Sequence, residues 1–144
     1  MTLNLETARQ IIRSILEQGA ARGMKPLSVC VIDSGGHPIA FERSDGASPM
    51  RFGIAHGKAY GAVMMGLGSR ALFERAEHQP YFIQAMNSLA GGSRVPVPGG
   101  VLVRHEGSIV GAVGVTGDSS DNDEECAIAA ISSAGFEADA GGGS

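Results

Sequence analysis

The chain has 144 residues, a formal net charge of −4 and hydrophobic residues at 43% of its positions. This length fits one domain with a sizeable core, and the dispersed basic residues exclude the clustered positive surface that nucleic-acid binding needs. No apolar run is long enough for a membrane helix, and the amino terminus lacks the pattern of a secretory signal. We therefore expect a cytoplasmic protein that binds neither nucleic acid nor membrane.

The first third of the chain is predicted to form a helix and a β-hairpin. Apolar residues recur at the spacing of an amphipathic helix that begins near Asn4 and stops near Gly23. Two strand-like segments follow, from Leu27 to Ile32 and from Pro38 to Arg43. The residues between them, Asp33-Ser34-Gly35-Gly36, tolerate the left-handed backbone conformations of a hairpin turn.

The middle of the chain is predicted to be helical. The dipeptide Ser48-Pro49 is typical of an N-cap followed by a first helical position, and it opens a helix that runs to about Gly66. Shorter helical segments begin at Ser69 and at Pro80, and the second of them ends at Gly91-Gly92.

A second hairpin is predicted from the segments Val101 to Arg104 and Ser108 to Thr116, with its turn at Glu106-Gly107. Both faces of the later strand are apolar, which predicts a central strand covered on both sides. Its glycines, at positions 111, 114 and 117, allow another backbone or a flat ligand to approach closely. A last helix begins after Asp121.

These elements define one domain over residues 1–137, followed by a flexible Gly/Ser tail over residues 138–144. Their order, α-β-β-α-α-α-β-β-α, is typical of an α+β domain with an antiparallel sheet.

Three glycines of the middle helix, Gly53, Gly57 and Gly61, follow one another at i, i+4 and i+8. Each costs about 1 kcal/mol relative to alanine in a helix interior, so we expect a compensating contact. That contact is either a flat ligand or partner helix, or close packing on the domain's own sheet. Arg51 and Lys58 lie seven residues apart on nearly one helix face, and are either carboxylate-binding groups or solvent-exposed charges.

Acidic residues gather between Asp118 and Glu125, where two interpretations compete. Hard cations take several oxygen ligands, but the segment lacks the pattern of a calcium-binding EF-hand loop. Asp121 and Glu124 have the spacing of a capping box, and carboxylates in a first helical turn interact favourably with the helix dipole. We favour the interpretation of these acidic residues as the start of a helix over a metal site, and the sequence identifies no metal ligands.

The histidines and cysteines form no recognisable catalytic or metal-binding pair. The four histidines lie far apart in the sequence, at His37, His56, His78 and His105. Each one is interpreted as an axial ligand, as a general base or as a surface residue, and these alternatives stay open. Cys30 and Cys126 form no CxxC motif, so we expect buried thiols.

Several segments together resemble the GlcG/HbpS family, whose module also closes some PduO-type proteins. The segments are Val31 to Ala47, Ile54 to Ala59, Pro98 to Gly100 and Gly111 to Gly117, with Asp123. They cover nearly the whole chain in order. The resemblance implies a five-stranded antiparallel sheet flanked by helices, similar in outline to profilin-like domains, and assembly into dimers or larger rings. Several family members are described as haem-binding proteins.

The resemblance also implies a ligand site, with haem as the candidate cofactor. Some members ligate haem through a histidine on the first helix, whereas the segment from Leu5 to Arg22 has none, so Thr116 or another histidine would substitute. Backbone amides at the start of the last helix favour an anionic group, although the acidic side chains there oppose it. The candidate binding residues are Arg51, Lys58, Arg94, Pro98, Gly99, Gly100, Thr116, Gly117, Asp118 and Asp123.

Two functions from different classes remain open. The first is a small-ligand-binding module, with haem or a related flat ligand, that acts in an oligomer in storage, sensing or delivery. The second is a cofactor-independent isomerase, lyase or hydrolase that acts on a small organic acid in a catabolic pathway. In that case Lys58 or Arg94 would hold the carboxylate, and His56 or Asp118 would move a proton at a pKa shifted toward neutrality.

Overall fold

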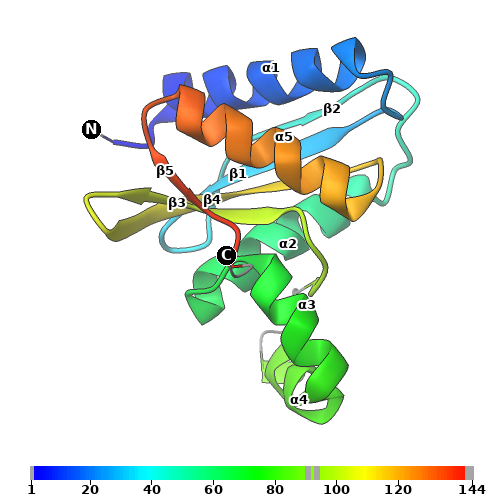
Figure 1. The fold of residues 1–144 in the computed structure, drawn as a ribbon, viewed down its shortest axis with the longest axis vertical. Coiled ribbons are helices and arrows are strands. Elements are labelled where there is room, and N and C mark those ends of the chain that lie inside the picture. Colours follow the sequence, from blue (N-terminus) through cyan, green and yellow to red (C-terminus); the bar gives the residue numbers. More distant parts are fainter. Residues whose placement is uncertain (1, 90–91, 93–94, 142–144) are drawn as a thin grey trace.

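A computed structural model describes residues 2–89, 92 and 95–141 of the chain. In these residues, helices cover both faces of a five-stranded antiparallel sheet, which confirms the predicted α+β class (Figure 1). The elements are α1 (Leu5–Ala21), β1 (Ser28–Asp33), β2 (Pro38–Arg43), α2 (Arg51–Met65), α3 (Ser69–His78), α4 (Pro80–Leu89), β3 (Gly100–His105), β4 (Ser108–Thr116), α5 (Ser120–Ser133) and β5 (Glu137–Asp139).

The strands follow the order β2-β1-β4-β3-β5, so the glycine-rich strand β4 lies at the centre, as its apolar faces predict. Alternate residues of β1 enter two separate cores. Val29 and Val31 pack beneath α1 and α5, whereas Cys30 and Ile32 pack beneath α2. The sheet is therefore buried on both faces along its central strands.

Helix α2 lies unusually close to the sheet because two glycines face it. Gly100 and Gly114 are directly opposite one another in the β3–β4 register. A Cβ atom at Gly114 would collide with the carbonyl oxygen of Ala55, and one at Gly100 would collide with that of Lys58. Of the three β4 glycines predicted to admit a backbone or a ligand, Gly114 therefore admits the backbone of α2.

Two of the three glycines in the α2 stripe are buried within the protein, and the third is exposed. Gly57 and Gly61 are buried, and the carbonyl oxygen of Gly57 accepts a hydrogen bond from the amide of Val95. Gly53 is exposed, and a Cβ atom there would meet nothing within 4 Å. Protein packing therefore accounts for two of the three glycines.

Two predicted helix starts are corrected by the structure. Ser48 is not the N-cap of α2: a turn in which Arg51 N–H donates to the Ser48 carbonyl comes first, and Met50 is the N-cap. The N-cap of α5 lies two residues before the predicted Asp121, because the Ser119 side chain already caps the helix by accepting from the amide of Asn122.

The carboxyl-terminal boundary is also corrected. Residues 137–139 form β5 at the edge of the sheet, next to β3, so the segment predicted as a tail contributes its fifth strand. The ion pair between Arg104 of β3 and Asp139, at 2.9 Å, fixes this edge. Residues 142–144, also assigned to the tail, lie outside the described residues.

Helices α3 and α4 extend away from the sheet on the side of α2 (Figure 1). They begin at Ser69 and Pro80, as predicted, whereas part of the predicted end at Gly91-Gly92 lies outside the described residues. The Arg75 guanidinium lies over the ring of Phe82 at 4.0 Å, which links the two helices. Within the described ranges, α4 packs against no element other than α3.

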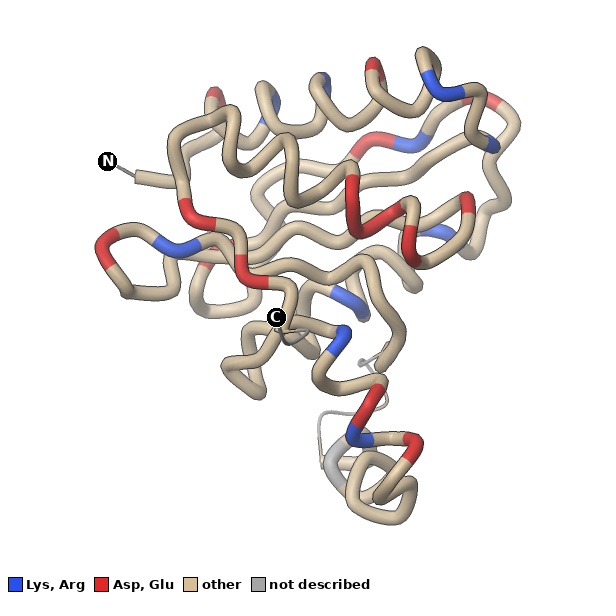
Figure 2. Tube along the Cα trace, in the orientation of Figure 1, with Lys and Arg blue, Asp and Glu red and all other residues tan. Residues whose placement is uncertain are grey.

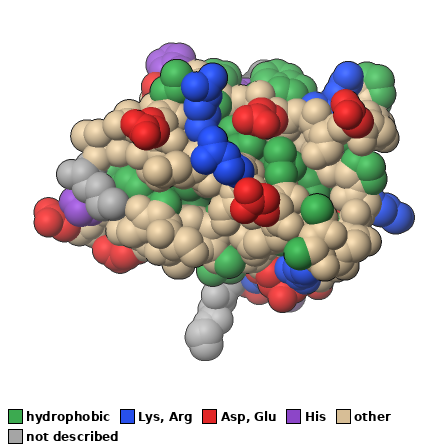
Figure 3. Space-filling model, turned by 90° about the horizontal axis from the view of Figure 1, so that it is seen from above, with side chains coloured by type: hydrophobic (Ala, Val, Ile, Leu, Met, Phe, Trp, Pro, Cys, Tyr) green, Lys and Arg blue, Asp and Glu red, His purple; other side chains and the backbone are tan. Residues whose placement is uncertain are grey.

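Charges of both signs are spread over the molecule (Figure 2). Viewed from the side of α1 and α5, acidic and basic side chains alternate without a single-sign patch (Figure 3). Acidic residues gather at the start of α5 (Figure 2). None of the helices in the described part of the chain is long and apolar enough to cross a membrane.

The contact between α2 and the sheet gives a first prediction. Gly114→Ala should lower the free energy of unfolding by about 1–3 kcal/mol, since the added methyl group forces the Ala55 backbone away from β4. Urea denaturation followed by circular dichroism measures this change.

Gly53→Ala is the matched control, at an exposed position of helix α2. It should raise stability by up to about 1 kcal/mol, because the added methyl group meets open space in a helix interior. Equal effects of the two substitutions would contradict the proposed close packing.

Candidate functional site

The sheet-facing side of α2 carries a buried ion pair. The Lys58 ammonium lies 3.6 Å from the Asp123 carboxylate of α5, and both side chains are almost completely buried. Lys58 Nζ also donates a 2.8 Å hydrogen bond to the carbonyl oxygen of Val115. An Asp123 oxygen accepts a hydrogen bond from the backbone amide of Asp118. Lys58 therefore links α2, β4 and the start of α5.

Burial and pairing act on these two groups in opposite directions. Burial lowers the pKa of the Lys58 ammonium and raises the pKa of the Asp123 carboxyl, because a dry environment disfavours both charged forms. Their mutual attraction opposes both shifts. The pair is thus held by the fold and is not available to a ligand in this arrangement.

The segment from Pro98 to Gly100 covers this pair. All three residues are buried, and a Cβ atom at Gly99 would approach Lys58 Nζ to 2.7 Å. Gly100 N–H donates to the hydroxyl oxygen of Ser69 at the start of α3. Gly117, which is also a candidate, has a φ of 140° and lies against the carbonyl of Pro26. These candidate glycines contact protein in the structure.

Arg51, the other basic candidate on this helix, lies at its first turn and stays partly exposed. Its guanidinium donates a 2.8 Å hydrogen bond to the Thr116 hydroxyl oxygen, which brings two candidate residues together. Ser28 is opposite Thr116 in the β1–β4 register, and its buried hydroxyl has no hydrogen-bond partner among the described residues. Arg43 is the register partner of Ser28 on β2. We call these four residues the polar corner.

Asp118 precedes α5 at the surface. The side-chain amide of Asn122 and the backbone amide of Lys25 both donate to its carboxylate, and they lower its pKa to about 2. Asp118 is therefore ionised at neutral pH and is poorly suited to accept a proton there.

A small cavity of about 260 Å³ lies between α3 and the start of α5. Pro98 is the candidate residue on its wall, beside Arg70 and Phe73. The Arg70 guanidinium forms ion pairs with Asp121 and Glu124, so the carboxylates outnumber the one cation here. Burial raises the pKa of the Glu124 carboxyl, and the hydrogen bond from Arg70 opposes that shift.

The outward side of α2 is different, because it carries rings at helical spacing. Phe52, His56 and Tyr60 stack along the helix with centroid separations of 5.7 and 5.4 Å. Phe41 of β2 meets Phe52 edge to face at 4.9 Å. Met64 continues the row one turn later and, like Phe52, is more than 40% exposed. We call these five residues the aromatic stripe.

The aromatic stripe and the polar corner are neighbours. Phe41 and Arg43 are two residues apart on β2 and therefore lie on the same face of the sheet. Arg51 and Phe52 are consecutive residues of α2. Two arginines, Arg43 and Arg51, therefore adjoin Phe41 and Phe52 along the strand and the helix.

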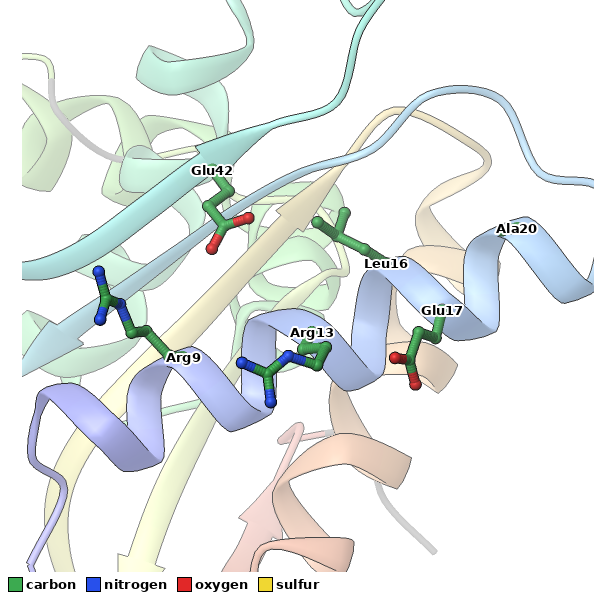
Figure 4. A pocket seen from close by; sticks show the side chains of 6 residues that line it. All are labelled: Arg9, Arg13, Leu16, Glu17, Ala20 and Glu42. Carbon is green, nitrogen blue, oxygen red and sulfur yellow. The ribbon is translucent and has the colours of Figure 1, made fainter.

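A second concave surface lies on the opposite face of the sheet, between α1 and β2. It encloses about 450 Å³, and Arg9, Arg13 and Glu17 of α1 line it together with Glu42 of β2 (Figure 4). None of the candidate binding residues lines this groove. Its charges are balanced in sign, so it has no preference for an anion or a cation.

The remaining candidates separate further. His56 and Lys58 are two residues apart on α2 and project to different sides of it, so the structure does not bring the proposed catalytic residues His56, Lys58 and Asp118 together. Arg94 lies outside the described residues. The described part of the chain holds no group of three or more His, Cys, Asp or Glu residues that could hold a metal ion.

Both cysteines are buried free thiols, as predicted. Burial raises the pKa of the Cys30 thiol to about 12, so this residue does not supply a thiolate at neutral pH.

Sequence reasoning missed the aromatic stripe. The spacing of Phe52, His56, Tyr60 and Met64 at successive i+4 positions was the available signal. Phe41 and Arg43 had no such signal, because only the sheet register brings them beside α2.

An antiparallel five-stranded sheet with two helices on one face and α2 on the other defines the structural class. The family model described as haem-degrading protein HbpS-like matches residues 3–132, and the chain belongs to this family. A structure of a PduOC–haem complex has a TM-score of 0.84 and 24% identity, over 94% of this chain and 97% of that one.

Two further proteins are similar over nearly the full length. A double mutant of HbpS from Streptomyces reticuli has a TM-score of 0.78 and 29% identity, over 92% of this chain and 87% of that one. An uncharacterised 15.0 kDa protein from the dhaT–dhaS intergenic region of Citrobacter freundii is 28% identical over 133 residues, or 90% of each chain.

The buried ion pair gives a second prediction. Lys58→Met should destabilise the protein by about 3–5 kcal/mol at neutral pH, because the Asp123 carboxylate remains buried without its partner. Removing Lys58 raises the pKa of Asp123 further. The deficit relative to wild type should therefore grow as pH rises and shrink toward about pH 4, where an unfolded aspartate also becomes protonated. Urea denaturation at several pH values measures it.

The double variant Lys58→Met, Asp123→Asn is the control for this prediction. It removes both charges and should recover part of the lost stability at neutral pH, with little of the pH dependence. A deficit of Lys58→Met that does not change with pH would show that the lost packing, and not the unpaired carboxylate, dominates.

Proposed function

We propose that this protein is a haem-binding module whose binding surface is the aromatic stripe on the outer side of α2. The observation that carries the proposal is the partly exposed row of rings, with Arg43 and Arg51 next to its first two rings along the strand and the helix. A flat apolar ring system with carboxylates on one edge matches this distribution of apolar area and positive charge. Membership of the HbpS-like family and the likeness to the PduOC–haem complex support the ligand class.

The cavity beside Pro98 is a less suitable site for haem than the aromatic stripe. Its volume of about 260 Å³ lies below the range of roughly 300–1,000 Å³ that is usual for pockets of drug-sized ligands. Its carboxylates outnumber Arg70, which opposes an anionic ligand. The outer side of α2 has neither restriction.

Arg51 and Arg43 are the residues that we assign to the propionate groups. Arg51 replaces Lys58 in this role, because Lys58 is buried and paired with Asp123. Its guanidinium is only partly exposed and is already oriented by Thr116, so a carboxylate would meet a charged donor whose position is fixed.

We further propose that the module acts as a homo-oligomer. Ligands of this size are usually buried over most of their surface, whereas the stripe offers one side only. A second copy of the chain would cover the outer side of the ligand and the exposed apolar side chains of α2. Storage, sensing and delivery of haem are all compatible with such an assembly.

The enzymatic alternative has no comparable support. The structure does not place His56, Lys58 and Asp118 at a common site, and Asp118 has a pKa far below neutrality. Action on a small organic acid remains a hypothesis to which the described residues assign no proton-transfer group.

Titration of the purified protein with hemin tests the proposed function. We expect a saturable Soret band at a fixed stoichiometry, and Arg51→Ala should weaken binding roughly two- to fivefold, the range for an exposed ion pair. The double variant Arg43→Ala, Arg51→Ala should bind more weakly still.

Arg13→Ala on α1 is the control, because it removes an arginine from the opposite face of the sheet. It should bind hemin as the wild type does. A featureless, non-saturating spectrum of the wild type would refute the proposed function, and an equal effect of Arg13→Ala and Arg51→Ala would refute the location.

A further inference from the structure

We infer that His56 supplies the protein ligand to the haem iron. This inference rests on the proposed haem-binding function and adds the residue that holds the metal. It starts from the four histidines of the chain, at positions 37, 56, 78 and 105, of which His56 is the one that belongs to the aromatic stripe.

The two thiols are poor candidates for this role. Cys30 lies in the core beneath α2, and burial raises the pKa of its thiol to about 12. Cys126 is buried beneath α1, and burial also raises its pKa. Neither side chain reaches the surface, and neither favours the thiolate form that binds iron.

The other histidines have different surroundings. His37 lies in the β1–β2 turn, where its imidazole faces the Asp33 carboxylate at 3.4 Å and is 79% exposed. His105 faces Glu106 and lies edge-on to Phe136, at the far end of β3. His78 is exposed at the end of α3. None of them belongs to the aromatic stripe.

His56 is half-buried between two rings, with Phe52 on one side and Tyr60 on the other. No hydrogen bond or ion pair engages its imidazole within the described part of the chain. Its ring plane makes angles of only 18° and 28° with those of its neighbours, so the three rings stand side by side along the helix. This order places a metal-binding nitrogen between two apolar rings.

That arrangement suits a flat macrocycle. A ring on a helix points its far edge away from the helix axis, because the ring plane contains the bond to Cβ. The edge of Phe52 can then meet the face of a macrocycle, the geometry that aromatic pairs favour, beside the imidazole of His56. A neutral imidazole is a common ligand of haem iron.

Tyr60 and Met64 are the competing donors on the same stripe. Met64 lies two turns from His56, or about 12 Å along the helix, too far to share one iron atom with it. Its side chain and the Tyr60 ring both pack against the β1–β2 turn at Gly36. His56 occupies the middle of the stripe, where rings flank it on both sides.

The test compares hemin complexes of the wild type, His56→Phe and His56→Ala by absorption and electron paramagnetic resonance spectroscopy. His56→Phe keeps a ring in the stack and removes only the nitrogen donors. We expect both variants to lose the histidine-ligated spectrum and to bind hemin about tenfold more weakly or worse. Free imidazole added to His56→Ala should restore the spectrum of the wild type.

Two control variants complete the experiment. His78→Ala, which removes an exposed histidine from α3, should leave both the spectrum and the affinity unchanged. Tyr60→Phe should keep the histidine-ligated spectrum, and loss of the iron ligation in this variant would overturn the assignment in favour of the tyrosine.

The outcomes separate this inference from the proposed function. A saturable hemin complex of the wild type with an unchanged spectrum in His56→Phe and His56→Ala would overturn the assignment of His56 and leave haem binding intact. Absence of a saturable complex in the wild type would refute both. Circular dichroism of each variant verifies that it is folded.

Discussion

The architecture depends on the close contact between the backbone of α2 and the glycine pair of β3 and β4. Any side chain at Gly100 or Gly114 would collide with a carbonyl oxygen of α2, so the helix settles directly on the pleated surface of the sheet. Alanines on the sheet-facing side of α2, among them Ala55 and Ala59, complete this thin layer. A helix held this close has a fixed rotation about its axis. The contact therefore decides which of its side chains are buried and which remain at the surface.

The fixed rotation separates two kinds of chemistry that are mixed in the sequence of α2. Lys58 faces the sheet in the middle of the helix, where only a buried carboxylate can compensate its charge, and Asp123 of α5 provides one. His56 and Tyr60 face outward in a row that no described element covers completely. The same packing thus turns one charged residue into a structural link between α2 and α5. It leaves His56 and Tyr60 on the outer side of the helix, the surface that we propose for the ligand.

Much of the fold could be predicted from local patterns, because apolar periodicity and glycine turns report directly on burial. The central position of β4 followed from its two apolar faces, and the hairpin turn at Glu106-Gly107 from its residue types. Strand β5 escaped prediction because its three residues, Glu137 to Asp139, pair only with a strand distant in sequence. The site was harder for the same reason. The spacing of seven residues placed Arg51 and Lys58 on one face of the helix. It carried no information on how deeply each side chain is buried, because the sheet beneath the helix determines that.

An open binding surface couples ligand binding to assembly. If the aromatic stripe holds one side of a flat ligand, a second protomer that covers the other side binds the loaded protein more tightly than the empty one. Thermodynamic linkage then requires that dimers bind the ligand more tightly than monomers by the same factor. A closed pocket within one subunit would lack this coupling. The close contact between α2 and the central strands leaves no room for such a pocket directly beneath this helix. Under the proposed assembly, ligand affinity would therefore depend on protein concentration.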